Sequence, residues 1–143
     1  MLKLPSYEPA WVDLAHGVRV LHRPARSAEV TAAVAWARGQ AAATAQRLPG
    51  FEPTETDMVN LRWGFATIAL GRLCITDWQG VEGDCTPDGV AALLALPDLA
   101  RAYLPHALGV ETAVSAEGNG CAPAPTGTTA GAVSIAEAAA PQG

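Results

Sequence analysis

The chain has 143 residues, half of them hydrophobic and only 16% charged, so it carries enough apolar material for one packed domain and is not disordered throughout. Nine basic against fourteen acidic residues give a formal net charge of −5. This balance argues against nonspecific nucleic-acid binding, which depends on lysine and arginine neutralising phosphates. No apolar run reaches the roughly 20 residues of a membrane-spanning helix, so no membrane partner is expected.

The first predicted element is a β-hairpin. Two short runs rich in strand-forming residues, 11–14 and 18–21, flank a tight turn in which Gly17 can take a positive φ. Pro24 ends the hairpin because proline cannot donate a hydrogen bond to a strand ladder.

Basic side chains gather in the first part of the chain. Residues 1–50 carry six basic and three acidic groups, whereas residues 51–143 carry three basic and eleven acidic groups. Arg19, Arg23 and Arg26 lie around the end of the predicted hairpin. Three interpretations stay open for them: a solvated edge, a contact face for an acidic partner, or pairing with the acidic part of the chain.

A long helix is predicted over residues 28–48. Almost all residues of this segment are strong helix formers, Ser27 is the expected N-cap, and a Pro-Gly pair ends the helix. Val30, Val34 and Ala37 fall at i, i+4 and i+7, so they are expected to share the face that meets the core.

A second helix is predicted to begin after Thr54 or Thr56, either of which can cap it. Leu61, Phe65 and Ile68 follow at i, i+4 and i+7. The apolar stripe that they form is interpreted first as part of the core. The alternative is a groove that receives a partner.

Residues 77–84 combine two glycines with three acids and are predicted to form a turn region or a short two-strand excursion. Thr86 then caps a helix whose first position is a proline, and Val90, Leu93 and Leu94 form the apolar face of this helix.

One more helix is predicted from Pro97 to Pro105, with Leu99 and Tyr103 facing inward. A short helical piece is expected to follow over residues 106–114. Proline at position 105 is expected to end the preceding helix, because it removes a backbone donor.

The composition changes at residue 115. Residues 115–143 contain almost no large apolar side chains and many glycine, proline and threonine residues. They bury too little surface to offset an ordering cost of about 1–2 kcal/mol per residue. The predicted organisation is therefore mainly α: residues 1–114 form a three- to five-helix domain with a small N-terminal β-hairpin, and residues 115–143 form a flexible tail.

The sequence lacks the common catalytic and cofactor motifs. It contains no G-x-S-x-G elbow, no phosphate-binding or dinucleotide-binding glycine loop and no H-E-x-x-H motif. Cys74, Cys85 and Cys121 are interpreted as free thiols in a reducing cytosol. A thiol enzyme is the weak alternative, because Cys74 lies in an apolar stretch that dulls its reactivity. The prediction is a protein that is not an enzyme and uses no cofactor or metal.

Three stretches of the chain carry a family resemblance. They are Trp11-Val12-Asp13-Leu14 with the residues through Pro24; Ile75-Thr76-Asp77-Trp78-Gln79-Gly80-Val81 with Thr86-Pro87 and Leu93-Leu94; and Glu117-Gly118-Asn119-Gly120 with the Pro- and Thr-rich residues after it. In this order they resemble the N-terminal hairpin, the "GW-x-GV … TPE … LL" segment and the polar tail of the tail assembly chaperones of long-tailed phages, prophages and gene-transfer-agent-like elements. Asp77 stands where that family often has glycine, and Gly118 where it often has lysine.

The resemblance implies a non-enzymatic protein of the host cytoplasm. Such a chaperone would bind the tape measure protein, with the tail tube protein as a second candidate partner. It would keep this long, aggregation-prone helical chain soluble until the tube polymerises around it. The alternative is a structural minor tail or connector protein that stays in the particle. The residues expected to contact the partner are Trp78, Val81, Leu93, Leu94 and Tyr103, each of which is equally a candidate for the core.

Overall fold

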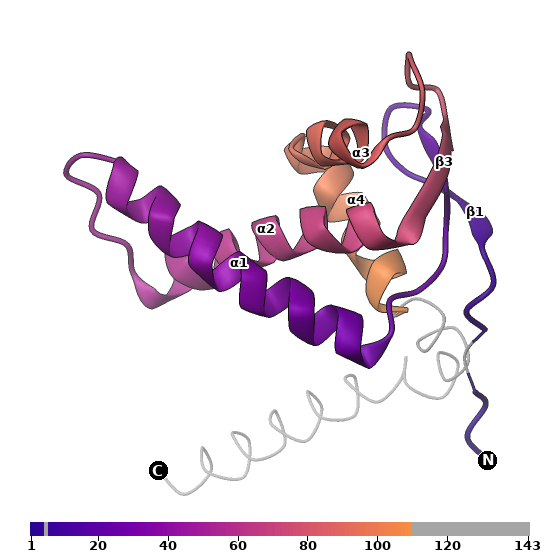
Figure 1. Ribbon diagram of the computed structural model, residues 1–143, viewed down its shortest axis with the longest axis horizontal. Coiled ribbons are helices and arrows are strands. Elements are labelled where there is room, and N and C mark those ends of the chain that lie inside the picture. Colours follow the sequence, from indigo (N-terminus) through magenta and orange to yellow (C-terminus); the bar gives the residue numbers. More distant parts are fainter. Residues whose placement is uncertain (5, 110–143) are drawn as a thin grey trace, which may run out of the picture. The chain divides into compact units, whose positions relative to one another are not determined.

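The computed structural model describes residues 1–4 and 6–109, which form a mainly helical unit with a small sheet (Figure 1). Its elements in chain order are β1 (Ala10–Asp13), β2 (Arg19–His22), α1 (Ser27–Arg47), α2 (Glu55–Cys74), β3 (Ile75–Gln79), α3 (Pro87–Leu94) and α4 (Pro97–Leu108). The predicted fold class, an N-terminal β-hairpin followed by three to five helices, is confirmed with four helices in the described residues. The predicted boundary after residue 114 and the predicted tail, residues 115–143, lie outside them.

The predicted hairpin is present, and a third strand joins it. β1 pairs antiparallel with β2, with Trp11 opposite Leu21, and the turn between them places His16 and Gly17 at φ angles of 57° and 75°. β3 pairs antiparallel with the other edge of β2, so the strand order is β1-β2-β3. Residues 77–79, predicted to belong to a turn region, are therefore extended because β2 supplies them with a partner strand.

The start of α1 is held by a carboxylate rather than by a hydroxyl. The predicted N-cap, Ser27, is the first helical residue, and the cap position is Arg26. An arginine side chain cannot accept a hydrogen bond, so Glu29 reaches back and accepts the backbone N–H of Arg26 at 2.8 Å. Arg23 donates to the same carboxylate through both terminal nitrogens, at 2.8 and 2.7 Å. Glu29 thus connects the end of the hairpin to the helix.

Acid should weaken the fold through Glu29. The hydrogen bonds from Arg23 lower the pKa of this carboxyl from 4.5 to about 2. The folded state therefore holds the proton less tightly than the unfolded chain, so the stabilisation is complete above about pH 4.5 and is lost as the pH falls toward 2. We expect Glu29→Gln to lower the free energy of unfolding by about 1–3 kcal/mol at pH 7 and by much less at pH 3.

Urea unfolding of both proteins at the two pH values measures this difference. Glu82→Gln, in an exposed loop, is the matched control and should change stability at neither pH. If Glu29→Gln lowered the free energy of unfolding by the same amount at pH 3 as at pH 7, the paired carboxylate would not be the source of the lost stability.

The arginines near the hairpin find partners within the N-terminal part of the chain. Arg19 lies 2.7 Å from the carboxylate of Asp13, and the guanidinium of Arg26 lies over the ring of Tyr7 at 5.5 Å. Together with the carboxylate pair of Arg23, these contacts pair the arginines inside the chain, but they are not the pairing with the acidic part of the chain that was one of the three interpretations. The acids involved come from the first 50 residues and not from the strongly acidic remainder.

α1 and α2 run antiparallel and pack closely along their lengths (Figure 1). The buried residues of α1 are Ala33, Ala37 and Ala41, which recur every four residues. Val30 and Val34, predicted for the core face, are only half-buried. A stripe of alanines lets the backbones approach but contributes little apolar area, which leaves larger side chains of both helices at the surface.

The predicted caps of α2 and α3 are confirmed. Of the two candidates for α2, Thr54 makes the cap: its hydroxyl accepts the N–H of Asp57 at 3.1 Å, and the Asp57 carboxylate accepts the N–H of Thr54 at 2.9 Å. The hydroxyl of Thr86 accepts the N–H of Gly89 at 3.0 Å, and Pro87 occupies the first turn of α3.

α4 continues through Pro105, where the sequence predicted its end. The helix ends at Gly109, which takes the left-handed conformation with a φ of 70°. Tyr103 and Ala107 are both fully buried, one on each side of the proline, so their packing holds the last turn in place despite the missing donor.

The core lies between the sheet and helices α2, α3 and α4. Its largest fully buried side chain is Tyr103, and Val20, Leu70 and Leu94 belong to the same cluster. A Cβ at Gly71 would collide with the side chain of Leu94, so the glycine lets α3 pack directly onto α2. This packing positions the end of α3 beside α2, where the candidate site lies.

Candidate functional site

An open apolar groove of about 570 Å³ lies between α2 and the connection from α3 to α4. One wall comes from α2 and the loop before it, and the other from the end of α3 and the start of α4. The lining residues are Phe51, Asp57, Asn60, Leu61, Gly64, Phe65, Ile68, Leu94, Ala95, Pro97 and Ala100.

The α2 wall is the apolar stripe whose spacing first favoured a place in the core. Leu61, Phe65 and Ile68 are all half-buried and line the groove, because α4 covers only part of this face of α2. The interpretation as core is therefore only partly right, and the alternative of a groove describes the open part of the stripe.

Gly64 leaves the groove unfilled at its middle. A Cβ at this position would meet no atom within 4 Å, so no protein side chain occupies the space above it. Polar groups lie at one end, where Asp57 and Asn60 line the groove. Hydrogen bonds from the backbone N–H and the hydroxyl of Thr54 lower the pKa of the Asp57 carboxyl, so this end carries a negative charge at neutral pH.

An aromatic pair extends the apolar surface from the groove toward α1. The rings of Trp36 and Phe65 lie edge to face with their centroids 6.2 Å apart. Trp36 belongs to α1 and is 42% exposed. An indole that remains this exposed beside an open apolar groove is typical of a protein-binding surface, where tryptophan is enriched.

The five residues predicted to contact the partner lie mostly in the core. Leu93, Leu94 and Tyr103 are buried, whereas Trp78 and Val81 are half-buried and pack against the core cluster. A partner could reach Tyr103 only if the core opened. Of the five, only Leu94 lines the groove.

Other groove residues were not predicted from the sequence. Phe51 comes from the connection between α1 and α2, and Pro97 and Ala100 come from the start of α4, which is distant from it in sequence. Of these residues, Phe51 could have been found from the sequence, because it is a large aromatic residue in an otherwise polar linker between two predicted helices.

The thiols in the described residues are held in their protonated form. Burial raises the pKa of Cys74 to about 11 and also raises that of Cys85. Cys121 lies outside the described residues. Within residues 1–4 and 6–109, no three His, Cys, Asp or Glu side chains are grouped so that they could hold a metal ion.

Comparison of the chain with protein-family models, curated proteins and solved structures finds no match. None of the helices in the described part is long and apolar enough to cross a membrane.

Proposed function

We propose that this protein is a tail assembly chaperone of a long-tailed phage or a related element, and that it binds the tape measure protein during tail morphogenesis. The observation that carries the proposal is the apolar groove between α2 and the α3–α4 connection, bordered by an exposed aromatic pair. The family resemblance supplies the identity of the partner, and the groove supplies a place for it.

The groove suits an amphipathic helix. Its α2 wall runs from Asp57 to Ile68, which corresponds to about 17 Å or three helical turns. A helix laid in such a groove is anchored by apolar side chains at i, i+3 or i+4, and i+7. Gly64 allows the backbone of that helix to come close to α2, as small residues do at helix contacts.

Charge gives the complex its solubility. The protein carries a net charge of −5. When the groove covers the apolar face of a bound helix, this negative charge remains on the surface of the complex and keeps complexes from associating. The proposed place of action is the host cytoplasm, before the tube polymerises, with the tail tube protein as a second partner. No catalytic step is part of the proposal.

Co-expression tests the proposal. The protein should keep an otherwise insoluble tape measure protein, encoded near it, in the soluble fraction and should co-purify with it. Mass spectrometry of purified particles should find the chaperone absent. Its stoichiometric presence in the particle would instead favour a minor tail or connector protein, and recovery of neither tape measure nor tube protein with the purified chain would contradict the proposal.

A further inference from the structure

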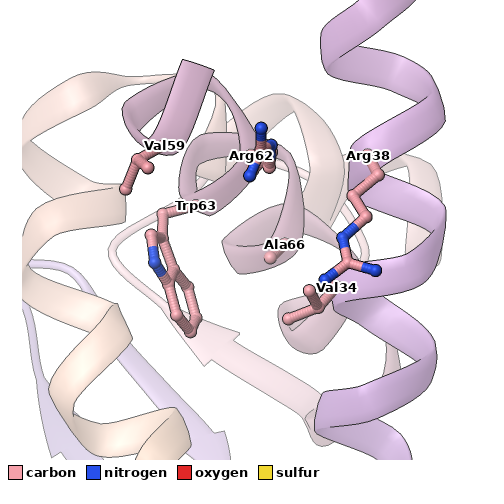
Figure 2. A pocket seen from close by; sticks show the side chains of 6 residues that line it. All are labelled: Val34, Arg38, Val59, Arg62, Trp63 and Ala66. Atoms are coloured by element: carbon pink, nitrogen blue, oxygen red, sulfur yellow. The ribbon is translucent and has the colours of Figure 1, made fainter. Parts of the chain in front are cut away.

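A second, smaller hollow lies between α1 and α2. It measures about 110 Å³ and is lined by Val34, Arg38, Val59, Arg62, Trp63 and Ala66. Figure 2 shows that Val34 and Arg38 come from α1 and the other residues from α2, with the ring of Trp63 forming one side of the hollow. Trp63 and Val59 are both more than one-third exposed, so the apolar part of the hollow is open to solvent.

The two arginines of this hollow differ from the other arginines of the chain. Within residues 1–4 and 6–109, neither Arg38 nor Arg62 has a hydrogen bond, an ion pair or a ring contact, whereas four other arginines lie within 4 Å of a carboxylate. Their neighbours three and four residues away along each helix are all uncharged. The hollow is therefore a positively charged surface without an internal counter-ion, on a protein of net charge −5.

We propose that this hollow is a docking site for an acidic amphipathic helix of a protein partner. One aliphatic side chain of that helix would enter beside Trp63, and a carboxylate one turn away would pair with Arg38 and Arg62. The hollow of about 110 Å³ suits one side chain smaller than benzene, which binds in a cavity of about 150 Å³. This inference goes beyond the proposed function, because it holds for any partner with this chemistry.

Charge complementarity selects this occupant over two others. A second copy that docked through the same surface would oppose Arg38 and Arg62 with its own Arg38 and Arg62, so it would bring like charges and no carboxylate to this hollow. A nucleic acid would present phosphates to the two arginines and a base to Trp63, but two cations neutralise few phosphates, and the aliphatic Val59 would stay uncovered. A helix that carries both a carboxylate and an aliphatic side chain satisfies the arginines and the tryptophan together.

A labelled synthetic helix tests the inference. The probe is a peptide of about 18 residues with leucine and glutamate four residues apart on one face. Fluorescence anisotropy with the full chain should show saturable binding that weakens at high salt. Arg38→Gln and Arg62→Gln should each weaken it about tenfold. Arg47→Gln, which alters another exposed arginine of α1, should leave it unchanged. A peptide with lysine in place of glutamate should not bind.

Several results would overturn the inference. The first is that the peptide shows no saturable binding at millimolar concentration, and the second is that the Arg38→Gln and Arg62→Gln variants bind it as tightly as the native protein does. The third is that the native protein binds a single-stranded oligonucleotide more tightly than the peptide. The fourth is that the native protein sediments as a dimer and each arginine variant as a monomer. Gly64→Gln fills the larger groove and should not affect this peptide. Loss of peptide binding in that variant alone would assign the peptide to the groove, so failure of the hollow and failure of the groove remain distinguishable.

Discussion

Tyr103→Ala is expected to lower the free energy of unfolding by about 3–5 kcal/mol, which is most of the stability of a marginal domain. Tyr103 is the largest fully buried side chain and belongs to the cluster formed by the sheet and helices α2, α3 and α4. Removing its ring leaves a cavity at the point where α4 meets the sheet. The ring of His22 lies edge to face against it at 5.6 Å and would lose this contact as well.

Tyr103→Phe is the matched variant and should behave in the opposite way. The hydroxyl of Tyr103 is buried and has no hydrogen-bond partner among the described residues. On folding, this hydroxyl loses its hydrogen bonds to water and gains none from the described residues, which destabilises the folded state. Tyr103→Phe removes that effect, so the variant should be as stable as the native protein or about 1 kcal/mol more stable. Urea unfolding followed by circular dichroism measures both variants. If the phenylalanine variant were destabilised as much as the alanine variant, the hydroxyl and not the ring would hold α4.

Gly64→Gln is expected to weaken binding of the tape measure protein by at least about thirtyfold, as loss of an interface hot spot does. A Cβ at Gly64 would meet no atom within 4 Å, so a glutamine side chain can begin there without a clash and extend into the groove. Glutamine is also a better helix former than glycine, so α2 should not be weakened.

Gly39→Gln is the control for this variant. Gly39 is also a glycine inside a long helix, its added Cβ would likewise meet open space, and it lines neither the groove nor the hollow. Both variants should unfold at the same or higher urea concentration than the native protein. Isothermal calorimetry against a purified tape measure segment should separate them. Equal affinities for the two variants would place the binding surface away from the groove.

The sequence predicted the helix starts that depend on a contact between residues close together in the chain. Thr54 and Thr86 cap their helices as expected, because a hydroxyl and the third backbone N–H are always within reach of one another. β3 was predicted only in part, as the start of a turn region or a short two-strand excursion over residues 77–84, because it follows α2 without a break and contains an exposed Asp77. Only pairing with β2, more than 50 residues earlier in the chain, makes it extended.

The groove was less predictable than the fold. A helical stripe such as Leu61, Phe65 and Ile68 has the same spacing whether it is covered by another helix or left open. The outcome depends on how far α4 extends over α2, which is determined by packing around Tyr103 and Leu94. For the same reason three of the five residues predicted as partner contacts, Leu93, Leu94 and Tyr103 of α3 and α4, are ones that the fold buries.

Site-specific photocrosslinking during co-expression tests most directly whether the groove holds a helix of the tape measure protein. A photoreactive residue at Ala100, in the groove, should crosslink to apolar positions of that protein spaced three or four residues apart. The same residue at Ala92, exposed on α3 outside the groove, should give none. Crosslinks from Ala92 in place of Ala100, or none from either with the complex intact, would contradict the account.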